Sequence, residues 1–198
     1  MIEFNNLNQE APYIIFKEKY DEAISKNQKN IEAIVISSYS VLSNEVNSRY
    51  VNLKMINNNN FTFFSNYSSP KSKEFIEHSQ ITALIFWNST NTQIRIKAKI
   101  KKNSAKYNHK YFLQRTDKKN ALAISSNQSK PIDSYESVVK NYKQSLESDN
   151  LKECPDYWGG YSFIPYYLEF WEGHSARLNK RDAYKKNGDT WDHSILQP

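Results

Sequence analysis

The sequence contains little glycine and cysteine and no long hydrophobic run. Only 4 of its 198 residues are glycine, and neither the P-loop nor the dinucleotide fingerprint, two glycine-rich patterns that cradle phosphates, occurs in it. A bound phosphate would therefore be held by side-chain cations and hydroxyls. The single cysteine, Cys154, cannot form an internal disulfide, which fits a reducing compartment.

Targeting and membrane-spanning segments are also lacking. The N-terminus has neither the basic start nor the apolar core of a signal peptide. The best apolar run, residues 81–87, is much shorter than the roughly 18 residues that a membrane-spanning helix needs. We therefore expect a cytoplasmic protein without a membrane partner.

Two common catalytic patterns are missing as well. The four histidines are scattered, and none pairs with another histidine or with cysteine at the spacing of metal ligands, so the sequence predicts no metal site. The Gly-x-Ser-x-Gly elbow that presents the nucleophile of many serine hydrolases does not occur.

Aromatic and basic side chains are abundant. Aromatics make up 14% of the residues, which excludes a largely disordered chain. A chain of this length can bury about 70% of its unfolded surface in one domain. The formal net charge of +6 fits a nucleic acid, an anionic membrane or a small phosphorylated ligand, and it fits equally a solvated lysine-rich surface.

The spacing of apolar residues predicts strands first, helices in the middle and strands last. Strands are expected over residues 33–36, 50–56, 61–64, 81–87, 93–101, 161–172, 176–185 and 190–196. Helices are expected over residues 12–25, 71–78, 105–114, 118–125 and 135–146. This order favours a mainly β protein with helices (α+β), an antiparallel β-barrel with peripheral helices that forms a single domain over residues 1–198.

Local features make this prediction more specific. Phe75 and Ile76 are both expected to face the core from the helix over residues 71–78. Pro165 lacks a backbone donor, so it predicts an edge position or a bulge in its strand. Asn187-Gly188 predicts the turn of a hairpin between the last two strands.

Several polar side chains could hold an anion close to aromatic segments. They are Arg49 and Lys54 on one strand, Ser65, Ser69 and Lys71 around a helix start, and Gln128, Ser129, Arg177 and Arg181. Two of the four tryptophans and three of the four glycines fall within residues 158–173. Scarce glycine beside aromatics suggests a backbone packed closely against a flat group.

An ordered set of short motifs runs through the chain. The motifs are Arg49-Tyr50-Val51-Asn52-Leu53-Lys54, Phe64-Ser65-Asn66-Tyr67-Ser68-Ser69-Pro70-Lys71-Ser72, Gln93 after Phe86-Trp87, Gln128-Ser129, Trp158-Gly159-Gly160-Tyr161, Leu168-Glu169-Phe170-Trp171-Glu172-Gly173, Arg177-Leu178 with Arg181, and Leu196-Gln197-Pro198. Over residues 12–198 this set resembles the FMN-dependent pyridoxine (pyridoxamine) 5′-phosphate oxidases, whose motifs include R-x-V-L-L-K, W-G-G-F/Y and I-E-F-W-Q-G.

The resemblance implies an FMN-binding split β-barrel that forms a homodimer, with FMN in clefts at the subunit interface. Residues 1–11 are then expected to be flexible, and residues 155–198 to form the dimerisation and active-site region. The implied cofactor-binding residues are Arg49, Tyr50, Val51, Asn52, Leu53, Lys54, Phe64, Ser65, Lys71, Gln93, Gln128, Ser129, Trp171 and Arg181, with Gln128-Ser129 coming from the second subunit.

The resemblance also implies a substrate and a reaction. The implied substrate-binding residues are Lys54, Tyr111, Arg115, Lys119, Arg177 and Asn179, of which Arg177 and Asn179 are the catalytic candidates. The implied reaction belongs to pyridoxine biosynthesis: FMN takes a hydride from pyridoxamine or pyridoxine 5′-phosphate, and O2 reoxidises the flavin and yields H2O2. The expected partners are a second copy, a small phosphorylated pyridine and O2, without nucleic acid.

Four positions depart from the pattern of that family. Pro70 and Ile195 stand where arginines are usual, Lys119 replaces a serine, and Asn179 replaces a histidine. Asparagine can donate a hydrogen bond but does not titrate near neutral pH. These departures keep two alternatives open: a related oxidase of the phenazine-pathway type that acts on another ring, and a non-catalytic protein that binds FMN or pyridoxal phosphate.

Overall fold

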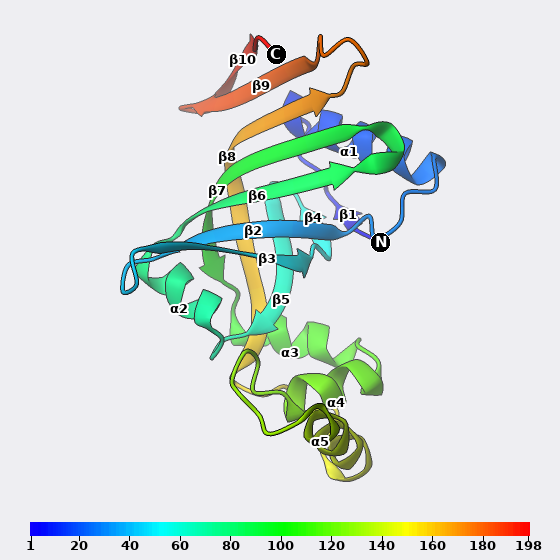
Figure 1. The fold of residues 1–198 in the computed structure, drawn as a ribbon, viewed down its shortest axis with the longest axis vertical. Coiled ribbons are helices and arrows are strands. Elements are labelled where there is room, and N and C mark those ends of the chain that lie inside the picture. Colours follow the sequence, from blue (N-terminus) through cyan, green and yellow to red (C-terminus); the bar gives the residue numbers. More distant parts are fainter.

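A single curled sheet of ten strands forms the centre of the molecule, and five α-helices lie around it (Figure 1). The structure is a computed structural model that describes residues 1–198. The strands are β1 (Glu3–Asn5), β2 (Ala33–Ser40), β3 (Glu45–Asn52), β4 (Met55–Asn57), β5 (Asn60–Asn66), β6 (Gln80–Trp87), β7 (Thr92–Lys102), β8 (Trp158–Glu172), β9 (Lys180–Asn187) and β10 (Thr190–Ile195). The helices are α1 (Ala11–Ser25), α2 (Pro70–Glu77), α3 (Ala105–Leu113), α4 (Asp117–Ser125) and α5 (Tyr135–Ser148), with a short 3₁₀ turn, η1, over Asn88–Thr90.

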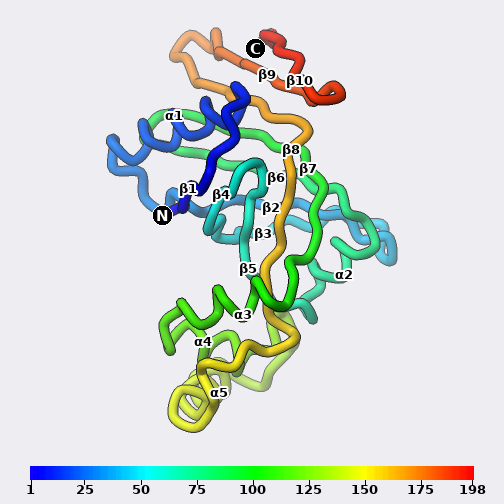
Figure 2. The backbone as a smooth tube through the Cα atoms, turned by 180° about the vertical axis from the view of Figure 1, so that it is seen from behind, coloured from blue at the N-terminus to red at the C-terminus, as the bar shows by residue number.

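The strands run in the order β1-β4-β5-β8-β7-β6-β2-β3, and β9 and β10 continue from the far end of β8. All neighbouring pairs are antiparallel except β1 and β4. The helices α3, α4 and α5 gather at the end of the molecule opposite the β9–β10 hairpin, as both ribbon views show (Figures 1 and 2). This antiparallel-rich half-barrel with helices confirms the predicted split-barrel fold.

The core lies inside the curl, where α1 covers it. Phe16 of α1 is fully buried, and its ring packs edge-on against Phe61 of β5 at 5.2 Å and Trp87 of β6 at 5.8 Å. Burying an aromatic side chain of this size contributes about 1.5–3 kcal/mol. The helix therefore joins strands that are distant in sequence. None of the helices combines the length and the apolar character needed to cross a membrane.

The stretch predicted as one strand over residues 50–56 is divided in two. β3 ends at Asn52 and β4 begins at Met55. Between them, the Leu53 backbone N–H donates to Glu32 and the Lys54 backbone N–H donates to Thr62, each at 2.8 Å. At this point the chain stops pairing with β2 and begins to pair with β5. Leu53 is fully buried.

The prediction for the inner face of α2 was half wrong. Phe75 is buried, but Ile76 is 67% exposed, and the buried polar residues of this helix are Lys71, Ser72 and Glu74. Adjacent helical residues point about 100° apart. The buried face of α2 is centred on Lys71, Ser72, Glu74 and Phe75, so the next position, Ile76, falls outside it. Residues three apart, such as Lys71 and Glu74, share a face.

The two features predicted for the C-terminal strands are present. The β7–β8 register shifts between Lys97 and Ala98, opposite Pro165, which is the expected bulge. Gly188 lies in the β9–β10 turn with a φ of 57°, a backbone conformation that glycine adopts without strain. The strand predicted over 176–185 begins only at Lys180, so Arg177 and Asn179 lie in the loop before it.

The first residues of the chain contact the sheet. Ile2 is buried in the core, and Glu3–Asn5 pairs with β4. That residues 1–11 are flexible stays a prediction.

Candidate functional site

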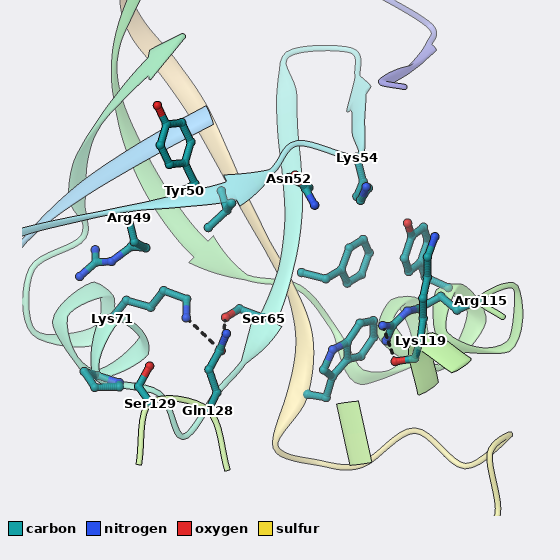
Figure 3. Close-up of a pocket in the computed structure, with 15 residues that line it drawn as sticks. Arg49, Tyr50, Asn52, Lys54, Ser65, Lys71, Arg115, Lys119, Gln128 and Ser129 are labelled. Carbon is teal, nitrogen blue, oxygen red and sulfur yellow. Dashed lines mark hydrogen bonds between the residues drawn. The ribbon is translucent and has the colours of Figure 1, made fainter. Parts of the chain in front are cut away.

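A cavity of about 570 Å³ opens where β3, β5 and the start of α2 meet α3 and α4 (Figure 3). Such a volume suits a small organic ligand. Five of the lining side chains are cationic and none is a carboxylate, so the cavity favours anions. We call it the cationic cavity; it is lined by Arg49, Tyr50, Val51, Asn52, Lys54, Phe64, Ser65, Pro70, Lys71, Tyr111, Arg115, Lys119, Gln128, Ser129 and Trp158.

Lys71 is the most buried cation at one end of this cavity. The residue is 7% exposed, and its Nζ donates to Ser69 Oγ at 3.1 Å and to Gln128 Oε1 at 3.0 Å. Both partners are neutral, so no carboxylate is bonded directly to the buried ammonium group. Burial, helped by the nearby charge of Arg49, lowers the pKa of Lys71 to about 8, while the charge of Glu74 opposes this shift. An anion bound here would pair directly with the ammonium group.

Gln128 joins the loop before α5 to this end of the cavity. Its Oε1 accepts hydrogen bonds from Ser65 Oγ at 3.0 Å and from the Asn66 backbone N–H at 3.3 Å. Ser129 follows with a φ of 67°, an uncommon conformation for a residue other than glycine. Gln128-Ser129 thus lies with Lys71 and Ser65 of the same chain, whereas we expected this pair to reach the site from a second subunit.

The other end of the cavity holds Arg115, Lys54 and Lys119. The Arg115 guanidinium lies 4.3 Å from the centre of the Trp158 ring, and its Nη2 donates to the Lys119 carbonyl at 2.8 Å. Its Nη1 is buried without a hydrogen-bond partner. Burial lowers the pKa of Lys54, and the charges of Lys119 and Arg115 lower it further, while Glu32 opposes the effect. An unpartnered buried donor among cations is suited to receive an anionic oxygen.

A flat aromatic surface accompanies these cations. Phe64 stacks on Tyr111 with ring centres 3.8 Å apart and on Trp158 at 5.1 Å, both within 8° of parallel. All three rings line the cavity. In the close-up, the labelled cations stand in two groups on either side of the view (Figure 3). The arrangement can accommodate two anionic groups and planar rings at once.

Three further predicted cofactor residues form a row on the C-terminal strands. Gln93 of β7 pairs with Trp171 of β8, which pairs in turn with Arg181 of β9. Arg181 is held by Glu169, whose Oε1 accepts from its Nε at 2.9 Å and its Nη2 at 2.8 Å. This β7–β9 row does not line the cationic cavity of its own chain.

The two catalytic candidates lie in the loop next to that row. Asn179 Oδ1 accepts a hydrogen bond from the His174 backbone N–H at 3.0 Å. Arg177 has a φ of 62°, so its backbone adopts a strained left-handed conformation of the kind that occurs at functional sites. Neither residue lines the cationic cavity.

Two outcomes differ from the predicted residue set. The side chain of Leu53 lies in the core and does not reach the cavity, so any contribution from this position comes from its backbone. Trp158 and Pro70 line the cavity but were not among the predicted binding residues. The Trp-Gly-Gly motif was the available signal for Trp158, although its glycines pack against protein: a Cβ on Gly159 would lie 2.3 Å from Tyr67 Oη.

Comparisons with known proteins agree with this fold. A family model described as the pyridoxine 5′-phosphate oxidase C-terminal dimerisation region matches residues 158–198. The pyridoxine/pyridoxamine 5′-phosphate oxidase of Haemophilus influenzae is 36% identical over 191 residues, covering 96% of this chain and 90% of that protein. Pyridoxine/pyridoxamine 5′-phosphate oxidase 1 of Hydrogenovibrio crunogenus is 31% identical over 194 residues, with coverage of 96% and 89%.

Two solved structures share the fold. PhzG from Burkholderia lata, in complex with tetrahydrophenazine-1-carboxylic acid, superposes with a TM-score of 0.87 at 24% identity, covering 94% of this chain and 92% of that one. A pyridoxamine 5′-phosphate oxidase-related, FMN-binding protein from Nostoc punctiforme superposes with a TM-score of 0.77 at 11% identity, with coverage of 92% and 97%.

The fold and the relatives together define a split-barrel oxidoreductase. More specifically, the chain belongs to the pyridoxine/pyridoxamine 5′-phosphate oxidase family.

Proposed function

We propose that this protein is an FMN-dependent oxidase that converts pyridoxamine or pyridoxine 5′-phosphate to pyridoxal 5′-phosphate. O2 is consumed and H2O2 released; with pyridoxamine 5′-phosphate, water also enters and ammonia leaves. The observation that carries this proposal is a single cavity with two groups of cations and an aromatic surface. Cofactor and substrate each bring one phosphate and one flat ring system, so they match both features.

The end with Lys71 fits the cofactor phosphate. Arg49 and Lys71 supply charge, and Ser65 and Ser129 supply hydroxyls, without any glycine loop. The local feature that favours an anion is the buried ammonium group of Lys71, which is hydrogen-bonded only to neutral partners. When bound, FMN supplies the hydride-accepting chemistry.

The end with Arg115 fits the substrate phosphate. Lys54, Arg115 and Lys119 provide three cations, and Tyr111 adds a hydroxyl beside its stacked ring. Lys119, where the family has serine, adds a charge rather than removing a ligand. By fixing the phosphate, these residues hold the reacting carbon of the substrate in one place, which is catalysis by proximity.

We further propose that a second copy of the chain completes the site. The β7–β9 row lies within or beside the family's dimerisation region but outside the cavity of its own chain. Tyr50 is 74% exposed and lines both the cationic cavity and a neighbouring cleft of about 480 Å³ that includes Leu84 and Phe86. The exposed rings of Tyr50 and Phe86 next to the cavity suit a symmetric partner. Such a partner would bring Gln93, Trp171, Arg181, Arg177 and Asn179 to the flavin.

The test is an absorption spectrum of FMN-loaded protein under anaerobic conditions. Adding pyridoxamine 5′-phosphate should bleach the flavin, and admitting air should restore the colour and yield H2O2. Pyridoxamine without its phosphate is the matched control, and it should react only at much higher concentration. A loaded protein that is bleached by neither phosphorylated vitamer contradicts the proposal. If a reduced phenazine precursor then bleaches the flavin, the protein is an oxidase that acts on another ring compound. If no compound bleaches it, the protein is a binding protein.

A further inference from the structure

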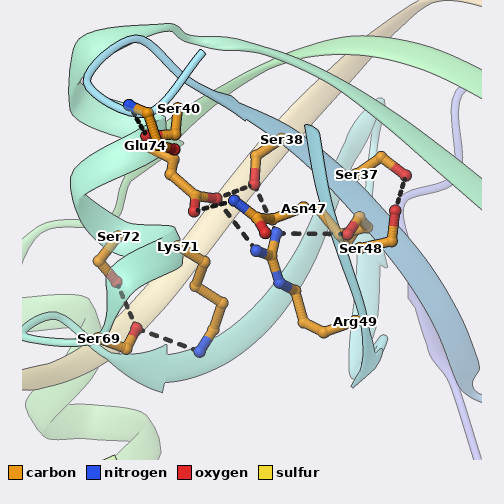
Figure 4. A network of polar contacts seen from close by, with 12 residues as sticks. Ser37, Ser38, Ser40, Asn47, Ser48, Arg49, Ser69, Lys71, Ser72 and Glu74 are labelled. Carbon is orange, nitrogen blue, oxygen red and sulfur yellow. Dashed lines mark hydrogen bonds and ion pairs between the residues drawn. The ribbon is translucent and has the colours of Figure 1, made fainter. Parts of the chain in front are cut away.

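A buried carboxylate lies directly behind the phosphate end of the cationic cavity. Glu74 of α2 is 5% exposed and does not line the cavity. Its Oε2 accepts from Arg49 Nη2 at 3.0 Å and from the Ser38 hydroxyl, and its Oε1 accepts from Asn47 Nδ2 at 3.1 Å (Figure 4). A carboxylate in such a buried place is stable only because three donors satisfy it.

This carboxylate is committed to Arg49 and not to the neighbouring lysine. Lys71 lies one turn earlier on the same helix, yet its Nζ bonds Ser69 and Gln128. Arg49 is also fixed through its second terminal nitrogen, since Nη1 donates to Ser38 Oγ and to the Ile36 carbonyl at 3.5 Å. Arg49 lines the cavity, whereas its partners Glu74, Ser38 and Asn47 do not.

We propose that Glu74 is the positioning residue for phosphate recognition. It holds Nη2 of the Arg49 guanidinium directly and Nη1 through the Ser38 hydroxyl, so that the guanidinium is already oriented before the phosphate binds. The inference rests on the proposed function, because it takes the anion at Arg49 to be the phosphate of FMN. A planar guanidinium binds an oxyanion well only in the correct orientation, which makes its preorganisation important for affinity.

The negative charge of Glu74 also has an electrostatic effect that opposes phosphate binding. Its negative charge partly cancels the attraction of Arg49 for the phosphate, so removing it could strengthen binding. Two cations that line the cavity, Arg49 and Lys71, stand at this end against one carboxylate that does not line it. We therefore expect the loss of orientation to outweigh the gain in charge. The sign of the change in FMN affinity when Glu74 is replaced separates the two roles.

The experiment compares FMN with riboflavin, which has the same ring but no phosphate. Dissociation constants are measured by quenching of flavin fluorescence for wild type, Glu74→Gln and Ser38→Ala. For Glu74→Gln, FMN affinity should fall about tenfold, as for one charged hydrogen bond, while riboflavin affinity stays unchanged. Ser38→Ala removes a neutral link in the same network, and it should act in the same direction but less strongly.

A double-mutant cycle excludes a purely structural role. With Arg49→Ala in place, adding Glu74→Gln should not weaken FMN binding further, because the residue that Glu74 positions is gone. Tighter FMN binding by Glu74→Gln would overturn the proposal in favour of charge cancellation. Equal weakening of FMN and riboflavin would overturn it in favour of general destabilisation. A wild-type protein that binds neither flavin would instead refute the proposed function, and this inference with it.

Discussion

Raising the pH from 7 to 9 should weaken FMN binding about tenfold, because the buried ammonium of Lys71 loses its proton in this range. With a pKa of about 8, Lys71 is protonated in about nine molecules of ten at pH 7 and in about one of ten at pH 9. The phosphate of FMN stays a dianion throughout, since its second pKa is about 6. If only the ammonium form binds the phosphate, the apparent dissociation constant rises by that ratio, or about 1.4 kcal/mol.

The assay is a fluorescence titration of apoprotein with FMN at pH 7, 8 and 9 and constant ionic strength. Riboflavin is the matched ligand, and its affinity should not change, because it has no phosphate. Lys71→Arg is the matched variant, since a guanidinium stays charged across this range and should flatten the profile. A wild-type FMN affinity that is constant from pH 7 to 9, or an equal slope in Lys71→Arg, would refute the reasoning.

Four other changes have expected outcomes. Folding lowers the pKa of Lys71 from 10.5, so between pH 8 and 10 the unfolded chain binds more protons than the folded chain does. In urea titrations the free energy of unfolding of the apoprotein should therefore rise over this range by about 2 kcal/mol relative to that of Lys71→Met. Arg115→Ala should raise the KM for pyridoxamine 5′-phosphate by the equivalent of about 1.5–3 kcal/mol while FMN affinity stays constant; equal loss of both would contradict the placement of the two phosphates. Phe86→Glu changes a side chain that is 52% exposed, so the subunit should remain folded while light scattering reports a monomer that no longer retains FMN; a stable dimer would argue against this interface. Gly159→Ala places a Cβ 2.3 Å from Tyr67 Oη and Asn108 Nδ2, and it should lower the thermal midpoint by the equivalent of about 1–3 kcal/mol; an unchanged midpoint would show that these side chains move aside easily.

Much of the fold could be predicted because the patterns involved are local. The alternation along β7, the turn at Asn187-Gly188 and the proline bulge of β8 each depend on residues close in sequence. The predictions that failed involve competition between distant parts of the chain. Leu53 and Lys54 leave the strand because Glu32 and Thr62 accept their backbone N–H groups. Ile76 is exposed because α2 turns Glu74 and Phe75 inward.

The candidate site likewise combines features that could be predicted from the sequence and features that could not. Arg49, Lys54, Ser65 and Lys71 could be named from motifs, and the structure brings all four to one cavity. The role of Glu74 could not be found from its neighbours in sequence, since its partners Ser38, Asn47 and Arg49 lie on β2 and β3. Nor could the sequence assign Gln128-Ser129 to the cavity of its own chain, which depends on how the loop before α5 crosses to β5.

The sequence by itself determined the kinds of group available: cations, hydroxyls and aromatic rings in a fixed order, with too little glycine to bind a phosphate through backbone loops. Only the tertiary structure decided which cations meet in one cavity, that Arg49 is held by the Glu74 carboxylate, and that burial lowers the pKa of Lys71 and Lys54. The physical reason is that side-chain identity sets the charge a residue can carry, whereas burial and distance to other charges set the energy of carrying it.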